Sequence, residues 1–105
     1  MVEIDDINPS LLLEAVLAWT GWQQEGIPRR KKSFLVDKFG SNEAARLLPA
    51  IQALEDDFYQ SDARFVADGL AEMGKLSADQ FRRKYPDLPD EISEAFAWCY
   101  TFDYK

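Results

Sequence analysis

One stretch of this chain already predicts its fold class: residues 8–22, which read NPSLLLEAVLAWTGW. Asn8 is of the type that caps helix N-termini, and Pro9 suits the first helical position, where its missing N–H has no partner to lose. The apolar side chains that recur at helical spacing are Leu12, Ala15, Val16, Trp19 and Trp22. We expect an amphipathic helix that ends at residues 26–28, with Gly21 inside it at a cost of about 1 kcal/mol relative to alanine.

Similar start and stop signals predict two further helices. A helix over residues 31–39 is expected to end at Gly40, since glycine readily adopts the left-handed conformation at a helix C-terminus. Ser41 is then expected to cap a helix over residues 42–60. Pro49 lies inside that segment, removes one backbone hydrogen bond and crowds the preceding turn, so we expect a kink or a break there.

The segment from residue 61 to residue 85 reads as two short helices. Ser61, with an aspartate after it, begins a helix that is expected to end at Gly74. Ser77 and Gln80 have the spacing of a capping box. In this motif the serine hydroxyl accepts a hydrogen bond from the backbone N–H of the glutamine, and the glutamine side chain accepts one from the backbone N–H of the serine. This box predicts a new helix start, and Pro86 ends that helix.

The last segment carries two competing patterns. Apolar residues recur at helical spacing at Leu88, Ile92, Ala95, Phe96, Cys99 and Phe102. Aromatic residues also alternate at a spacing of two, which is typical of a half-buried strand, at Phe96, Trp98, Tyr100, Phe102 and Tyr104. A lone strand needs a partner, and the other candidate strand (residues 33–36) is short, so we favour helix. The expected fold is all-α: a compact orthogonal bundle of five or six short helices in one domain, residues 1–105.

The composition excludes most conventional catalytic sites. The chain has no histidine and one cysteine, Cys99, so it lacks the usual activated Ser or Cys nucleophile, a zinc site and an internal disulfide. Its five glycines stand apart from one another and form no phosphate-binding loop. We therefore expect no enzymatic activity, no cofactor and no metal, and we expect Cys99 to pack in the core. A carboxylate-based enzyme is the weakest alternative left open.

The charge balance bears on partners and location. A net charge of −7 disfavours general binding to nucleic acid, which needs a surplus of Lys and Arg, and it steers basic partners toward the protein. No run approaches the roughly 18 apolar residues of a membrane span, and the acidic N-terminus is unlike a secretory signal. We expect a soluble cytoplasmic protein that has no contact with membranes.

Two segments are candidate binding surfaces. The first is an acidic–aromatic segment, expected to be exposed together with Tyr100 and Tyr104, that consists of Glu55, Asp56, Asp57, Phe58 and Tyr59. The second is a basic run whose placement before a helix is electrostatically unfavourable, consisting of Arg29, Arg30, Lys31 and Lys32. The basic run either forms a solvated loop or binds an anionic group. That group could be a phosphate, an acidic partner, or acids of the same chain such as Glu3, Asp5 and Asp6.

Two functions from different classes follow from these surfaces. The first is a protein-binding module that inhibits or regulates a partner, with a basic partner favoured. Its most specific form is an immunity-like or antitoxin-like inhibitor, by analogy of size and charge alone. The alternative is a regulatory protein associated with nucleic acid through residues 29–32 and 82–84. That alternative becomes credible, despite the net charge, if both basic runs lie on one face of the molecule. The partner's identity and the oligomeric state stay open.

Overall fold

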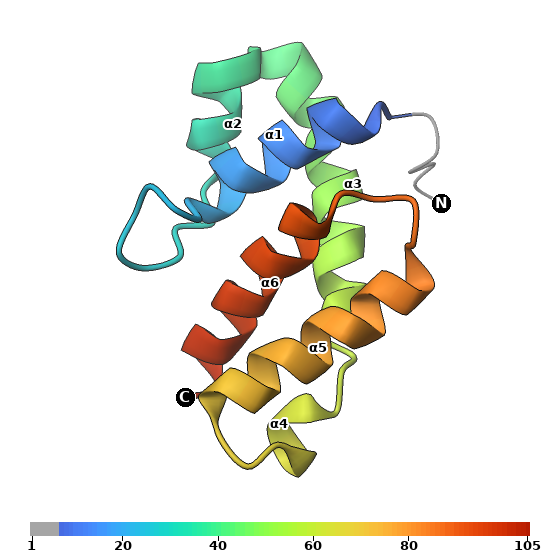
Figure 1. The fold of residues 1–105 in the computed structure, drawn as a ribbon. Helices are drawn as coiled ribbons and strands as arrows, with labels where there is room; N and C mark the ends of the chain where they lie inside the picture. Colours follow the sequence, from blue (N-terminus) through green and yellow to red (C-terminus); the bar gives the residue numbers. More distant parts are fainter. Residues whose placement is uncertain (1–6) are drawn as a thin grey trace.

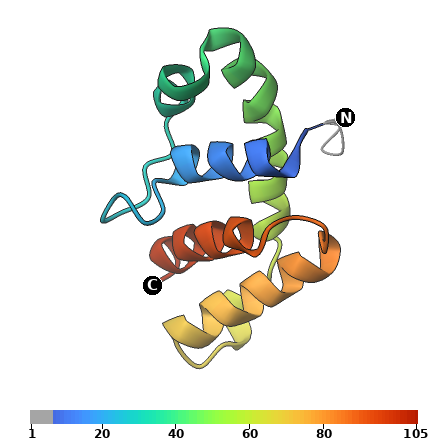
Figure 2. The same ribbon diagram turned by 45° about the horizontal axis from the view of Figure 1, so that its top comes forward.

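The computed structural model describes residues 7–105, which form six helices and no strand (Figure 1). The helices are α1 (Pro9–Thr20), α2 (Lys32–Phe39), α3 (Ser41–Phe58), α4 (Ala63–Val66), α5 (Leu70–Lys84) and α6 (Asp90–Asp103). The expected all-α bundle of short helices is thereby confirmed. In Figure 2, α6 lies between α1 and α5, and α3 runs behind them. None of the described helices is long and apolar enough to cross a membrane.

The first helix begins as expected and ends earlier than expected. The Asn8 side chain accepts hydrogen bonds from two backbone N–H groups of the first turn, at 2.8 and 3.4 Å. The helix stops at Thr20, and the prediction that Gly21 lies inside it is wrong. Gly21 has a φ of 78°, and a Cβ atom there would lie 2.8 Å from the Glu25 side chain. Only glycine adopts this left-handed conformation without strain, so Gly21 ends the helix.

The next two helices follow the expected order, with two corrections. Gly40 ends α2 with a φ of 84°, as predicted, but Ser41 is already the first residue of α3, and no side chain caps that helix. The predicted break at Pro49 is wrong, because α3 continues through it. Burial of one apolar face on both sides of the proline outweighs the lost hydrogen bond. That face, 0–2% exposed, consists of Ala44, Leu47, Ala50, Ile51, Leu54 and Phe58.

The segment between α3 and α6 departs most from the prediction. The helix that begins at Ala63 ends at Val66, so α4 is a single turn. The next helix, α5, begins at Leu70 and continues through both Gly74 and Ser77. The capping-box prediction is wrong: Ser77 is 1% exposed inside α5, and its hydroxyl donates to the carbonyl oxygen of Gly74. Gly74 is not a helix end, because it lies where α5 meets α6. A Cβ atom at Gly74 would stand 3.3 Å from the methyl group of Thr101.

The last helix settles the choice between helix and strand. Residues 90–103 form α6, as favoured, and its buried face belongs to the core. Four aromatic rings from three helices meet there with centroids 5.4–5.9 Å apart: Phe58 of α3, Phe81 of α5, and Phe96 and Tyr100 of α6. Such tilted and edge-on pairs stabilise a core beyond simple burial. The α3, α5 and α6 helices are therefore fixed around one aromatic centre.

Candidate functional site

Most of the acidic–aromatic segment is used inside the protein. The Glu55 carboxylate accepts a hydrogen bond of 3.3 Å from the indole Nε1 of Trp19. Burial raises the pKa of Glu55, and the Trp19 bond opposes that shift. Asp57 accepts a hydrogen bond from the hydroxyl of Tyr85, and burial together with this bond raises the pKa of Tyr85 to about 12. Two of the three acids are thus partnered within the fold.

The aromatic half of the same segment is not an exposed pair. Phe58 is only 2% exposed, so the prediction that it is exposed to a partner is wrong. Tyr59 is half-buried, and its hydroxyl donates to Asp103 at 2.6 Å. Tyr100, also expected at the surface, is completely buried. Within the five-residue segment, Asp56 is the one residue classed as exposed.

Arg30 belongs to a polar cluster that ties three parts of the chain together. Its guanidinium makes two hydrogen bonds to Asp103, of 2.8 and 3.1 Å, and one of 3.1 Å to the Tyr59 hydroxyl. Burial acts to raise the pKa of Asp103, but the bonds from Arg30 and Tyr59 outweigh it and lower that pKa. The hydrogen bond with Asp103 in turn raises the pKa of Arg30. This cluster joins the α1–α2 loop to the ends of α3 and α6, which is a structural role.

The two basic runs do not share a face. Arg29 and Lys31 are exposed before α2 and Lys32 is exposed as its first residue, whereas the second run ends α5 on the opposite side of the molecule (Figures 1 and 2). In the second run, Arg82 lies within 3.5–3.6 Å of the carboxylates of Asp79, Asp90 and Glu94. The condition set for a nucleic-acid surface is therefore not met. The acids Glu3, Asp5 and Asp6 lie outside the described residues.

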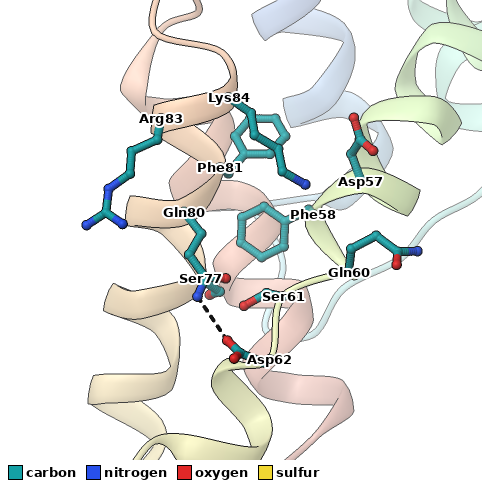
Figure 3. Close-up of a pocket in the computed structure, with 10 residues that line it drawn as sticks. All are labelled: Asp57, Phe58, Gln60, Ser61, Asp62, Ser77, Gln80, Phe81, Arg83 and Lys84. Atoms are coloured by element: carbon teal, nitrogen blue, oxygen red, sulfur yellow. Dashed lines mark hydrogen bonds between the residues drawn. The ribbon is translucent and has the colours of Figure 1, made fainter.

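A cavity of about 450 Å³ lies between the end of α3 and α5 (Figure 3). The Gln80 side chain donates a 3.0 Å hydrogen bond to Asp62 across it, and this bond links the two walls. Arg83 and Lys84 are exposed at its edge. The cavity thus carries charges of both signs, with its second acid, Asp57, already bonded to a tyrosine.

The described residues contain neither a reactive thiol nor a group of side chains that could bind a metal ion. Cys99 is completely buried, as expected, and burial raises its pKa to about 12, which keeps it protonated. A thiol that stays protonated at neutral pH is a poor nucleophile. Within residues 7–105, no three potential ligand side chains come together in a way that could hold a metal ion.

One end of the molecule exposes large apolar side chains. They are Phe65 (75% exposed), Val66 (60%), Leu70 (48%) and Tyr104 (40%), and we call these four residues the apolar end face. In Figure 1, α4, the start of α5 and the C-terminus gather at this end. The first three lie in the segment for which the sequence predicted one continuous helix, from Ser61 to Gly74. The polar residue and glycine at positions 68 and 69 were the signal that this helix is interrupted.

The exposed Phe65 ring contacts the guanidinium of the neighbouring Arg64. The Arg64 guanidinium lies 4.5 Å from the centroid of the Phe65 ring and 4.7 Å from that of Tyr104. The same guanidinium donates hydrogen bonds of 3.0 and 3.3 Å to the carbonyl oxygens of Ser61 and Tyr59. The backbone N–H of Arg64 donates to the hydroxyl of Tyr100 at 3.0 Å. The exposed Phe65 ring thus stacks on a guanidinium that backbone oxygens hold in place.

A shallow groove of about 410 Å³ adjoins this face between α5 and α6. The residues that line it include Leu70, Lys75 and Arg82 of α5, Glu94 and Trp98 of α6, and Trp22. Leu70 belongs to both the groove and the apolar end face. Searches with this chain against protein-family models, curated proteins and solved structures find no match, so its function is argued from this geometry.

Proposed function

We propose that this chain is a cytoplasmic protein-binding module, without catalytic activity, that regulates or inhibits a basic partner by docking through the apolar end face. The observation that carries the proposal is the exposure of Phe65 at 75% beside Val66 at 60%. Large exposed apolar clusters mark interaction sites, and aromatic residues dominate the binding energy of protein interfaces. An anchor whose orientation is already favoured in the free protein loses less conformational freedom when a partner docks.

The stacking of Phe65 on Arg64 supports this role. The Phe65 ring stacks on the Arg64 guanidinium, and that guanidinium donates hydrogen bonds to two backbone carbonyl oxygens. Contact between a guanidinium and an aromatic face is worth about 0.5–1 kcal/mol at an exposed site. The stacking therefore favours one orientation of the ring in the free protein.

Charge supports a partner of opposite sign. Within residues 62–72, which span α4 and the start of α5, the acids Asp62, Asp68 and Glu72 outnumber the single cation, Arg64. The net charge of the chain is −7, so a basic protein is attracted at long range, while a second copy is repelled. Apolar contact then supplies affinity at short range.

Affinity capture with matched variants tests the proposal. The chain is immobilised and exposed to lysate of the organism that encodes it, in parallel with Phe65→Ala and Ile27→Ala. Ile27 is 48% exposed on the α1–α2 loop and serves as the control for loss of an exposed apolar side chain. We expect wild type and Ile27→Ala to capture the same proteins and Phe65→Ala to lose them. Added salt is expected to release these proteins from wild type. Capture of the same proteins by Phe65→Ala contradicts the proposal.

A further inference from the structure

The cavity between the end of α3 and α5 is lined by charged side chains of both signs that form no ion pair within the described residues. They are Asp57 and Asp62 on the side of α3 and the start of α4, and Arg83 and Lys84 on α5. Both carboxylates accept hydrogen bonds, but the donors are the neutral hydroxyl of Tyr85 and the neutral amide of Gln80. Neutral donors do not cancel a charge, so the two walls keep opposite signs.

A buried hydroxyl in the same cavity has an unused donor. Ser61 is 8% exposed, and its Oγ accepts a hydrogen bond of 3.1 Å from the backbone N–H of Ala63. The other serine of the cavity, Ser77, donates to the carbonyl oxygen of Gly74, whereas no acceptor for the Ser61 hydroxyl lies among residues 7–105. A buried donor that lacks an acceptor is unfavourable, so an oxygen atom of a ligand at this position stabilises the site.

The charges of the walls favour a ligand that carries both signs. A simple anion drawn to Lys84 would face the carboxylates of the opposite wall, and a simple cation drawn to Asp62 would face the two cations of α5. A zwitterion presents the opposite sign to each wall, so neither of its ends meets a like charge. The cavity of about 450 Å³ falls within the range of about 300–1,000 Å³ typical of ligand pockets.

The spacing of the charges indicates how long the zwitterion is. Gln80 donates to Asp62 at 3.0 Å, so this acid lies level with Gln80, and Lys84 follows one turn later on α5. Figure 3 shows the same order, with Lys84 extending from α5 toward α3. One turn corresponds to roughly 6 Å along the helix axis. The two charges of a free amino acid stand on a single carbon atom and lie closer together, whereas a dipeptide spans roughly 7 Å at about 3.3–3.6 Å per residue.

We propose that this cavity binds a dipeptide with free ends, its carboxylate toward Lys84, its ammonium toward Asp62 and its peptide carbonyl oxygen toward the Ser61 hydroxyl. The ammonium and the carboxylate supply the two charges that the walls lack, and the peptide oxygen supplies the acceptor that Ser61 lacks. The site contains no residue of the apolar end face, so this inference goes beyond the proposed function and does not rest on it.

Isothermal titration calorimetry with four small probes tests the need for two separated charges. The probes are alanyl-alanine, its N-acetyl derivative without the ammonium, its C-terminal amide without the carboxylate, and free alanine. We expect alanyl-alanine to bind saturably with a Kd below about 1 mM, and each of the other three to bind at least about ten-fold more weakly. Absence of saturable binding by alanyl-alanine, or equal affinity of any of the other three probes, overturns the proposal.

Two cavity variants with matched controls assign each end of the dipeptide to a wall. Lys84→Met removes the cation and keeps an unbranched side chain, and Asp62→Asn removes the acid but keeps an oxygen acceptor for Gln80. The controls, Lys75→Met and Asp68→Asn, make the same changes at exposed positions of α5 and just before it that do not line the cavity. We expect the cavity variants to weaken binding of alanyl-alanine by about ten-fold and the controls by less than about two-fold. Circular dichroism verifies that all four variants are folded.

Combining variants and probes gives the most specific result. If the carboxylate of the dipeptide faces Lys84, the Lys84→Met variant no longer distinguishes alanyl-alanine from its amide, and Asp62→Asn no longer distinguishes it from the N-acetyl derivative. Discrimination that persists in both variants, or equal affinities of the cavity variants and their controls, refutes the assignment. Phe65→Ala is expected to leave dipeptide binding unchanged, so this result is read independently of partner capture.

Discussion

Replacing Tyr100 with phenylalanine is expected to destabilise the fold by about 2 kcal/mol, although the aromatic ring is kept. The Tyr100 hydroxyl is buried, accepts from the backbone N–H of Arg64 at 3.0 Å and donates to the carbonyl oxygen of Ser61 at 2.9 Å. Without it, that N–H has no partner, which costs about 1–3 kcal/mol in a buried site. The Ser61 carbonyl keeps its bond from the Arg64 guanidinium, so only about 1 kcal/mol is lost there.

Urea unfolding followed by circular dichroism measures this loss. With a slope of about 2 kcal/mol per molar urea, the midpoint of Tyr100→Phe is expected to fall by about 1 M. Tyr104→Phe is the matched control, because Tyr104 is 40% exposed and its hydroxyl makes no hydrogen bond within the described residues. Its stability is expected to stay within about 0.5 kcal/mol of wild type. Equal midpoints for the two variants would refute the reasoning.

The same substitution has a local consequence that global stability does not report. Because the Tyr100 hydroxyl holds the first residues of α4, its removal is expected to raise amide hydrogen exchange over residues 63–66 more than over α3. The Phe65 ring then loses its fixed orientation. In a capture experiment, Tyr100→Phe is expected to weaken partner binding even under conditions where most of the protein is folded.

Three further substitutions test the polar clusters and the first helix end. Asp103→Asn is expected to cost about 1–2 kcal/mol at pH 7 in urea unfolding. Because the folded pKa of Asp103 is lowered, this difference is lost as the pH falls below about 4. Glu55→Gln keeps an acceptor for the Trp19 indole. Because the pKa of Glu55 in the folded state is raised above its ordinary 4.5, ionisation of this carboxyl destabilises the fold as the pH rises. The variant is therefore expected to have a higher melting temperature than wild type at pH 7 and the same melting temperature at pH 4. Gly21→Ala is expected to lower the unfolding free energy by about 1 kcal/mol because of its positive φ, whereas Gly26→Ala, with an open environment, changes it little; equal melting of the two would contradict this.

Helix positions followed from the sequence wherever the decisive signal was local. Asn8 caps α1, Gly40 ends α2 and Pro86 follows the end of α5, each through the geometry of one or two residues. The capping box at Ser77 failed although its spacing is correct. Packing of α5 against the core buries Ser77 to 1% exposure, and tertiary burial outweighs a cap of about 1 kcal/mol.

The candidate site was less predictable, because its acids are partnered by residues far away in the chain. Glu55 bonds to Trp19, 36 positions away, and Tyr59 bonds to Asp103, 44 positions away. Local periodicity contains no information on such pairs. The sequence therefore indicated an exposed acidic–aromatic segment where the fold instead uses those side chains to connect α3 with α1 and α6.

The exposure of Phe65 has a cause that only the assembled fold reveals. Because the four side chains of a single helical turn point in successive directions around the axis, the four residues of α4 cannot all reach the core. Ala63 is buried, and the two residues at the other end of the turn, Phe65 and Val66, face solvent. The internal network around Arg64 keeps this turn in place. Acids that are buried or bonded elsewhere still contribute to the long-range field of the protein, so under the proposed function charge would attract the partner and Phe65 would determine where it docks.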